Sequence, residues 1–190
     1  MTLSLNNPYK NGYGNGIYIS LVTIADVEDI SGTTPPFMNF PIDIGLKLHL
    51  DVGKGFYPQM IIAGNFQRNV PTDEVSGWGS AFVVQDFLNK LGFTGKLNKD
   101  NKIPVNIIQS IIGKKFYRLS YVTGIREDGK LKYSDWNIIA TAEEGPEYLA
   151  EKFQKSFLKG YPKNYRPELA GTENYNQNSF ANNGNDQNIF

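Results

Sequence analysis

The sequence predicts a mainly β protein: a five-stranded barrel with a helix between the third and fourth strands, followed by a C-terminal helix and a disordered tail. Residues 41–52 alternate between apolar and polar side chains, and residues 81–93 repeat apolar side chains at helical spacing. Residues 115–141 contain a hairpin rich in aromatic side chains. The length of 190 residues, with 40% hydrophobic residues, suits one domain with appendages.

The first three strands are predicted between residues 17 and 69. Residues 17–30, IYISLVTIADVEDI, are rich in β-branched side chains, which favours an extended strand. The second strand would bury one face, because side chains alternate across a strand. Residues 57–69 follow as the third strand. The buried face of the second strand would consist of Ile42, Ile44, Leu46, Leu48, Leu50 and Val52.

The predicted helix spans residues 81–93, AFVVQDFLNKLGF. Ser80 can cap its start, and Gly92 can end it. A shorter helical turn is expected between Pro104 and Gly113. The apolar stripe of the main helix comprises Val83, Val84, Phe87, Leu88 and Leu91, with Phe82 at its edge.

The last two strands are expected to form a hairpin from residues 115–125 and 130–141. Glu127-Asp128-Gly129 would supply the turn, because Asp-Gly readily adopts positive φ. The order strand, strand, strand, helix, strand, strand matches the OB-fold, a small Greek-key barrel that binds oligonucleotides and oligosaccharides. We therefore divide the chain into a flexible N-terminal arm (1–16), an OB-fold nucleic-acid-binding core (17–142), a C-terminal helical extension (143–169) and a disordered Asn-rich tail (170–190).

Composition and motifs argue against catalysis. Lys+Arg 19 balance Asp+Glu 19, so any basic patch must be local. Cysteine is absent and His49 is the single histidine, which excludes thiolate and His-rich metal sites. The N-terminal glycines precede a strand, so they cannot place a pyrophosphate on a helix terminus. We predict a protein that is not an enzyme and has neither a metal nor a cofactor.

The N-terminal residues 1–16 lack the basic start and the apolar run of a signal peptide. No apolar run in the sequence approaches membrane-spanning length. We therefore expect a soluble cytoplasmic protein without a membrane partner.

Residues 110–139 interleave cationic and aromatic side chains. Single-stranded nucleic acid requires both types, because stacking on a ring contributes about 1–3 kcal/mol per base and cations follow the backbone. The predicted phosphate contacts are Lys47, Arg68, Lys114, Lys115, Arg118, Arg126, Lys130 and Lys132. The predicted base-stacking residues are Tyr57, Phe66, Phe116, Tyr121, Tyr133 and Trp136.

Packing is the competing explanation for these rings, because strands are enriched in aromatic side chains and about half of the rings would be core in any barrel. Phe116 and Arg118 share one face of their strand, which favours that face as the ligand surface. In an OB-fold, the ligand lies between the loop joining strands one and two and the loop joining strands four and five. Here these loops would be residues 31–40 and 124–130.

The chain resembles the single-stranded DNA-binding proteins encoded in the replication modules of tailed bacteriophages. The resemblance covers residues 17–141 and depends on AFVVQDFLNKLGF, on IIQSIIGKKFYRLSYV with its Ile-Gly-Lys element, and on the closing strand 129–139. It implies an OB barrel that coats exposed single-stranded DNA during replication or recombination, in the host cytoplasm.

The C-terminus is similar to the tips of bacterial single-stranded DNA-binding proteins, whose acidic end and final Pro-Phe recruit replication proteins. This chain ends NDQNIF, with Asp186 as its one acid and Ile189 in place of proline before Phe190. The resemblance implies a partner-binding tail at Asp186, Ile189 and Phe190. A tail that only solubilises the protein is the alternative.

Other functions remain open at this stage. A phage structural or interaction protein that does not bind nucleic acid would suit Asn-rich arms and a β-rich core equally well. A carbohydrate-binding barrel is a third alternative, because aromatic platforms also stack on sugars. The sequence leaves open the choice between DNA and RNA, the site size and whether the 146–159 helix mediates self-association into a homo-oligomer.

Overall fold

A computed structural model describes residues 16–35, 39–53, 58–99 and 102–170 of the chain. These residues form two compact units. The first, called the hairpin unit, has the described residues 16–19, 119–136 and 150–170. The second, called the sheet unit, has the described residues between 20 and 118 together with 137–149.

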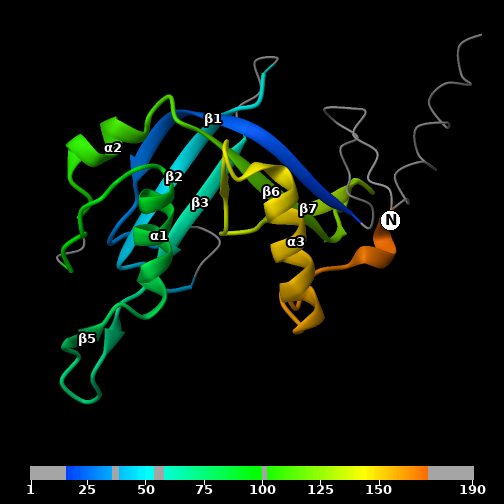
Figure 1. Ribbon diagram of the computed structural model, residues 1–190. Coiled ribbons are helices and arrows are strands. Elements are labelled where there is room, and N and C mark those ends of the chain that lie inside the picture. Colours follow the sequence, from blue (N-terminus) through cyan, green and yellow to red (C-terminus); the bar gives the residue numbers. More distant parts are fainter. Residues whose placement is uncertain (1–15, 36–38, 54–57, 100–101, 171–190) are drawn as a thin grey trace, which may run out of the picture. The chain divides into compact units, whose positions relative to one another are not determined.

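The structure is mainly β, as predicted, and Figure 1 labels its elements. β1 pairs with β2 and β6, β2 pairs also with β3, and β6 pairs also with β7 and β8. The resulting order β3-β2-β1-β6-β7 is consistent with an OB-like barrel. The strands are β1 (Ile17–Asp29), β2 (Ile44–Asp51), β3 (Gln59–Gly64), β4 (Gln67–Arg68), β5 (Val75–Gly77), β6 (Lys115–Ile125), β7 (Leu131–Asp135) and β8 (Ala140–Thr141).

The helices occur where the sequence predicts them. α1 lies between β3 and β6, α2 precedes β6, and α3 follows the last strand. No helix among the described residues has both the length and the apolar character that a membrane span needs. The helices are α1 (Phe82–Lys90), α2 (Val105–Ile111) and α3 (Gly145–Leu158), with short 3₁₀ helices η1 (Gly79–Ala81) and η2 (Pro167–Leu169).

The second strand confirms the alternating pattern. Ile42, Ile44, Leu46, Leu48 and Leu50 are all at most 2% exposed, whereas the polar side chains between them are partly exposed. Antiparallel pairing sets buried residues of β2 directly opposite buried residues of β3, with Leu46 facing Ile62 and Leu48 facing Met60. This apolar face is the core of the sheet unit, and its burial is the main force that fixes the register.

α1 covers this core with the stripe that the sequence predicts. Val84, Phe87 and Leu88 are buried, and the Phe87 ring meets the Phe116 ring edge-on at 5.7 Å. Gly92 has φ +94° just after the helix, in agreement with its predicted role. The predicted cap at Ser80 is wrong. Its Oγ accepts a hydrogen bond from the backbone N–H of Asn65 at 2.9 Å, and η1 precedes α1 instead.

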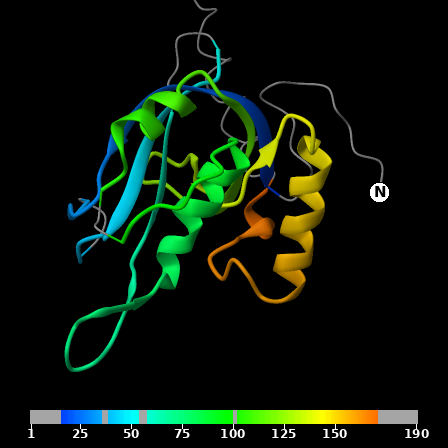
Figure 2. The same cartoon turned by 60° about the vertical axis from the view of Figure 1, so that its left-hand side comes forward.

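The predicted third strand is shorter than expected, because the chain breaks after Gly64 and β4 starts a separate hairpin with β5. A Cβ at Gly64 would lie 2.3 Å from the carbonyl oxygen of Ser80, so β3 and η1 approach each other as only glycine allows. Within the sheet unit, this hairpin extends away from β2 and β3 (Figures 1 and 2). The sequence predicts no strand between the third strand and the helix at 81–93, so β5 differs from the prediction.

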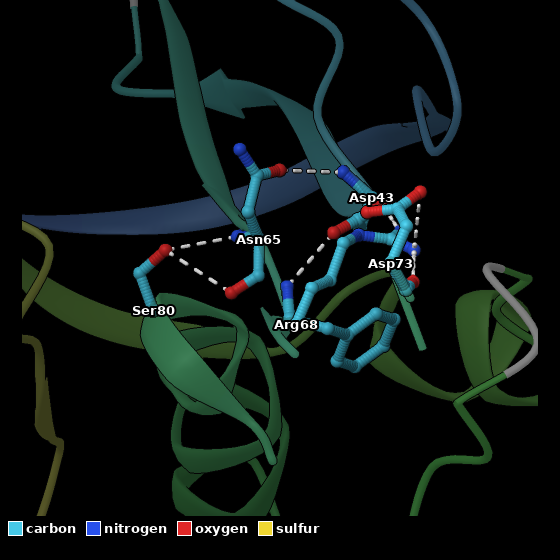
Figure 3. A network of polar contacts seen from close by, with 6 residues as sticks. Asp43, Asn65, Arg68, Asp73 and Ser80 are labelled. Carbon is cyan, nitrogen blue, oxygen red and sulfur yellow. Dashed lines mark hydrogen bonds and ion pairs between the residues drawn. The ribbon is translucent and has the colours of Figure 1, made fainter. Parts of the chain in front are cut away.

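A polar network holds the base of the β4–β5 hairpin (Figure 3). Asp43 accepts hydrogen bonds from Arg68 Nη2 at 2.6 Å and from the Phe66 backbone N–H at 2.8 Å. The Asp43 backbone N–H donates to Asn65 Oδ1 at 2.7 Å. Arg68 also donates to the carbonyl of Asp73 at 3.2 Å. The Asp43 carboxylate therefore joins the start of β2 to the hairpin.

Replacing Asp43 by asparagine is expected to lower the free energy of unfolding by about 1–3 kcal/mol, because the acceptor of the half-buried guanidinium loses its charge and one of the two accepting oxygens becomes an NH₂ donor. Asp73→Asn is the matched control. The Asp73 side chain is 82% exposed and lies 3.9 Å from Arg68, so its loss should change stability by less than about 0.5 kcal/mol. Urea unfolding of both variants checks this, and equal effects would contradict the role given to Asp43.

The hairpin unit has a core of aromatic rings. Phe153 of α3 is fully buried and packs against Tyr121, Trp136 and Tyr165, with ring centroids 5.3 to 5.4 Å away. The Arg166 backbone N–H donates to the carbonyl of Val122 at 2.9 Å, which ties the segment after α3 to β6. Figure 2 shows this segment, in orange, returning along the helix.

The predicted fifth strand is divided in two. β7 pairs with the second half of β6, whereas β8 pairs with its start, through Phe116 opposite Thr141 and Tyr117 opposite Ala140. The arm 1–15 and the tail 171–190 lie outside the described residues, so their predicted flexibility stays a prediction.

Candidate nucleic-acid interface

Most of the rings predicted to stack on bases are buried. Phe116 is 0% exposed, Phe66 5%, Tyr121 6% and Trp136 9%. Phe66 packs edge-on against Trp78, and Tyr121 and Trp136 pack against Phe153. A ring enclosed by other side chains has no face for a base, so burial argues against stacking by these four residues, and their predicted role stays a prediction.

The face of β6 that carries Phe116 and Arg118 is the predicted ligand surface, and burial argues against this prediction as well. Phe116 is fully buried and Ser120 is 6% exposed, so this face is covered. Arg118 is half-buried and takes part in further interactions of its own. Its predicted phosphate contact therefore has less support than those of exposed cations.

Among the described residues that were predicted to stack on bases, Tyr133 is exposed, with 36% of its surface accessible. Its ring meets that of Tyr18 edge-on at 5.0 Å, and its hydroxyl donates to the Tyr18 hydroxyl at 3.3 Å. Both belong to the hairpin unit, so β1 supports the ring that β7 presents. Tyr57 lies outside the described residues.

The predicted cations of the sheet unit are dispersed. Lys47 on β2 donates to Glu28 at 2.9 Å, and Arg68 is held by Asp43. Both are therefore committed to internal partners, which weakens their predicted role. Lys114 and Lys115 are exposed at the start of β6 and remain predicted phosphate contacts.

Arg126, Lys130 and Lys132 are brought together at the turn of the β6–β7 hairpin. The Arg126 backbone N–H donates to the carbonyl of Lys130 at 2.7 Å, and that of Gly129 donates to the carbonyl of Arg126 at 2.9 Å. Gly129 has φ +77°, so the turn forms as predicted. This geometry sets Arg126 directly opposite Lys130.

A shallow hollow of about 830 Å³ lies at this hairpin. Tyr133 and the half-exposed Ile125 provide apolar surface, and Arg126 and Lys132 provide positive charge. Acidic side chains reduce that charge at one end. The lining residues are Ile125, Arg126, Glu127, Asp128, Leu131, Lys132 and Tyr133.

The side chains whose pKa values are shifted do not line this hollow. Burial raises the pKa values of the Tyr121 and Tyr165 hydroxyls in the aromatic core. Burial lowers the pKa of Lys90, but the hydrogen bond and ion pair with Glu144 outweigh it, so the net pKa is raised. Lys90 also lies 4.9 Å from the Tyr148 ring. These groups join elements within a unit, and none of them lines the hairpin hollow.

A second group of cations lies in the sequence at the end of α3, where Lys155 pairs with Glu151 and Arg166 with Glu168. Between residues 152 and 166 the chain carries cations but no acidic residue. Phe157 is 41% exposed and Tyr161 61% exposed beside them. The charge count of this segment was the available signal, but residues 143–169 were treated only as a helical extension. The cations are Lys152, Lys155, Lys159, Lys163 and Arg166.

The partner-binding tip predicted at Asp186, Ile189 and Phe190 lies outside the described residues. Within the described part of the chain, no group of three or more His, Cys, Asp or Glu side chains is arranged to hold a metal ion.

Comparison with known proteins adds no family to this picture. A scan against protein-family models and a search of the curated proteins both found no match.

Proposed function

We propose that the protein binds single-stranded DNA through the β6–β7 hairpin, with little sequence preference, during replication or recombination. The observation that supports this most directly is the hairpin hollow, where the Tyr133 ring lies beside Arg126 and Lys132. A cation beside an exposed ring is the combination that an unpaired strand needs. Binding of this kind involves no catalysis and needs no cofactor.

The strand order supports the same proposal. In an OB-fold, the loop between the fourth and fifth strands is one of the ligand-binding loops. If β6 and β7 are these strands, the hollow lies at the position where a Greek-key OB barrel binds oligonucleotides. The cations at the end of α3 belong to the same unit and offer a further surface for a longer strand, and Lys114 and Lys115 stay predicted phosphate contacts.

A titration of fluorescein-labelled oligo-dT, at about 50 mM and about 200 mM salt, tests the proposal. We expect binding that weakens with salt, because phosphate contacts release counterions. Tyr133→Ala should lose about 1–3 kcal/mol of binding free energy if the ring stacks on a base. Phe82→Ala is the matched control, because Phe82 is also an exposed ring, 57% accessible, but lies on α1 of the sheet unit.

Absence of oligo-dT binding at low salt would contradict the proposal. Equal losses in the two aromatic variants would contradict the location of the site while leaving DNA binding intact. A parallel titration with oligo-rU decides between DNA and RNA.

The second candidate function is a phage structural or interaction protein without nucleic-acid binding. The projecting β4–β5 hairpin favours it, because Val70 at its tip is 94% exposed. A protein of this class would copurify with particles and would show no affinity for oligo-dT. Recruitment of replication proteins through the tail, homo-oligomerisation and a cytoplasmic location remain predictions.

A further inference from the structure

We propose that Asp128 sets the affinity of the hairpin site, because it pairs with two cations that a phosphate would otherwise bind. Its Oδ1 lies 3.5 Å from Arg126 Nε, and its Oδ2 lies 3.9 Å from Lys130 Nζ. Asp128 is thus an internal anion at the centre of the turn. This inference depends on the proposed function.

The backbone holds the Asp128 carboxylate in place. The Lys130 backbone N–H donates to Asp128 Oδ1 at 3.1 Å, across two positions of the turn. Aspartate favours such local hydrogen bonds in turns. The carboxylate therefore remains near both cations even when their long side chains move.

An anion near Arg126 and Lys130 stabilises the turn. Arg126 and Lys130 lie opposite each other across the hairpin, and like charges in that position repel. Asp128 relieves this repulsion in the free protein. A DNA phosphate would relieve it equally well, so the two anions compete for the same pair of charges.

The exchange is feasible because all three side chains are accessible. Arg126 is 62% exposed, Lys130 77% and Asp128 42%. Exposed ion pairs are weak and screened by salt. A phosphate can therefore displace the Asp128 carboxylate from the two cations. The carboxylate stays in the turn, and its negative charge repels the phosphate and lowers the affinity for DNA.

Asp128→Asn tests the inference without breaking the turn, because the amide oxygen can still accept the hydrogen bond from Lys130. Glu127→Gln is the matched control. It removes the same charge from the same hollow, and no ion-pair partner of Glu127 occurs in the described part of the chain. Both variants are titrated with oligo-dT as full-length chains, and thermal melting checks that they fold.

We expect Asp128→Asn to bind oligo-dT about threefold to tenfold more tightly at about 50 mM salt, and Glu127→Gln less than about twofold more tightly. The salt dependence of Asp128→Asn should steepen by about one unit of slope, because cations freed from the carboxylate now release counterions. Equal tightening in both variants, or no tightening by Asp128→Asn while the wild type binds, overturns the inference alone. Absence of binding by every protein overturns the proposed function as well.

Discussion

Replacing Phe153 by alanine is expected to lower the free energy of unfolding by about 3–5 kcal/mol, the cost of removing a large ring from a core that cannot fully collapse. Phe153 is 0% exposed, and its ring lies 5.3 to 5.4 Å from those of Tyr121, Trp136 and Tyr165. Three rings on different segments would lose their common partner. Since single domains are stable by about 5–15 kcal/mol, the loss is a large share of the total.

Phe157→Ala provides the control for this prediction. Phe157 is one helical turn further along α3 and also meets the Tyr165 ring, at 5.0 Å, but 41% of its surface is exposed. We expect a loss of about 1 kcal/mol, because less apolar surface leaves the core. Urea unfolding followed by tryptophan fluorescence measures both variants, and a comparable loss in each would contradict the central position of Phe153.

Removing the hairpin cations is expected to produce the largest effect on binding. In the triple variant Arg126→Ala, Lys130→Ala, Lys132→Ala, oligo-dT affinity at about 50 mM salt should fall about 100-fold, with each contact contributing on the order of 1 kcal/mol. The salt slope should decrease by about two, because each lost phosphate contact with a single strand accounts for about 0.7.

A triple variant in the sheet unit is the control for charge alone. Lys96→Ala, Lys99→Ala, Lys102→Ala removes the same net charge from exposed positions in the segment after α1. We expect its affinity to fall by less than about threefold, because exposed charges that make no phosphate contact are largely screened by salt. If the two triple variants weaken binding equally, the hairpin is not the site and only net charge matters.

The elements could be predicted from the sequence wherever the signal was local. Period two in residues 42–50 gave the buried face of β2, and the Asp128-Gly129 pair located the hairpin turn. The helical stripe of α1 depends only on spacing along the chain. In each case the side chains that carry the pattern are close in sequence to the structure they determine.

The roles of the β6 rings could not be predicted in this way, because different elements cover the strand along its length. Phe116 meets Phe87 of α1, whereas Tyr121, five residues later, meets Phe153 of α3. A register shift between Val122 and Gly124 further disturbs the alternation. The parity of a strand separates buried from exposed faces only when one face is open to water.

Ion pairs between residues distant in sequence could not be predicted from the sequence pattern either. Asp43 and Arg68 are 25 positions apart, and the sequence pattern predicts only a phosphate contact for Arg68, with no sign of its partner. Their hydrogen bond forms only because β3 ends at Gly64 and the chain turns back toward the start of β2. The exposed cations that remain for a ligand could be identified only after such pairs were known.

The assembly of the hairpin unit from distant segments has a consequence for biosynthesis. When the ribosome has released the chain only as far as β8, Tyr121 and Trp136 still lack the ring of Phe153, which is translated later. The nascent hairpin therefore emerges with exposed aromatic surface. Chaperones that bind apolar surface should bind this hairpin until α3 has been synthesised.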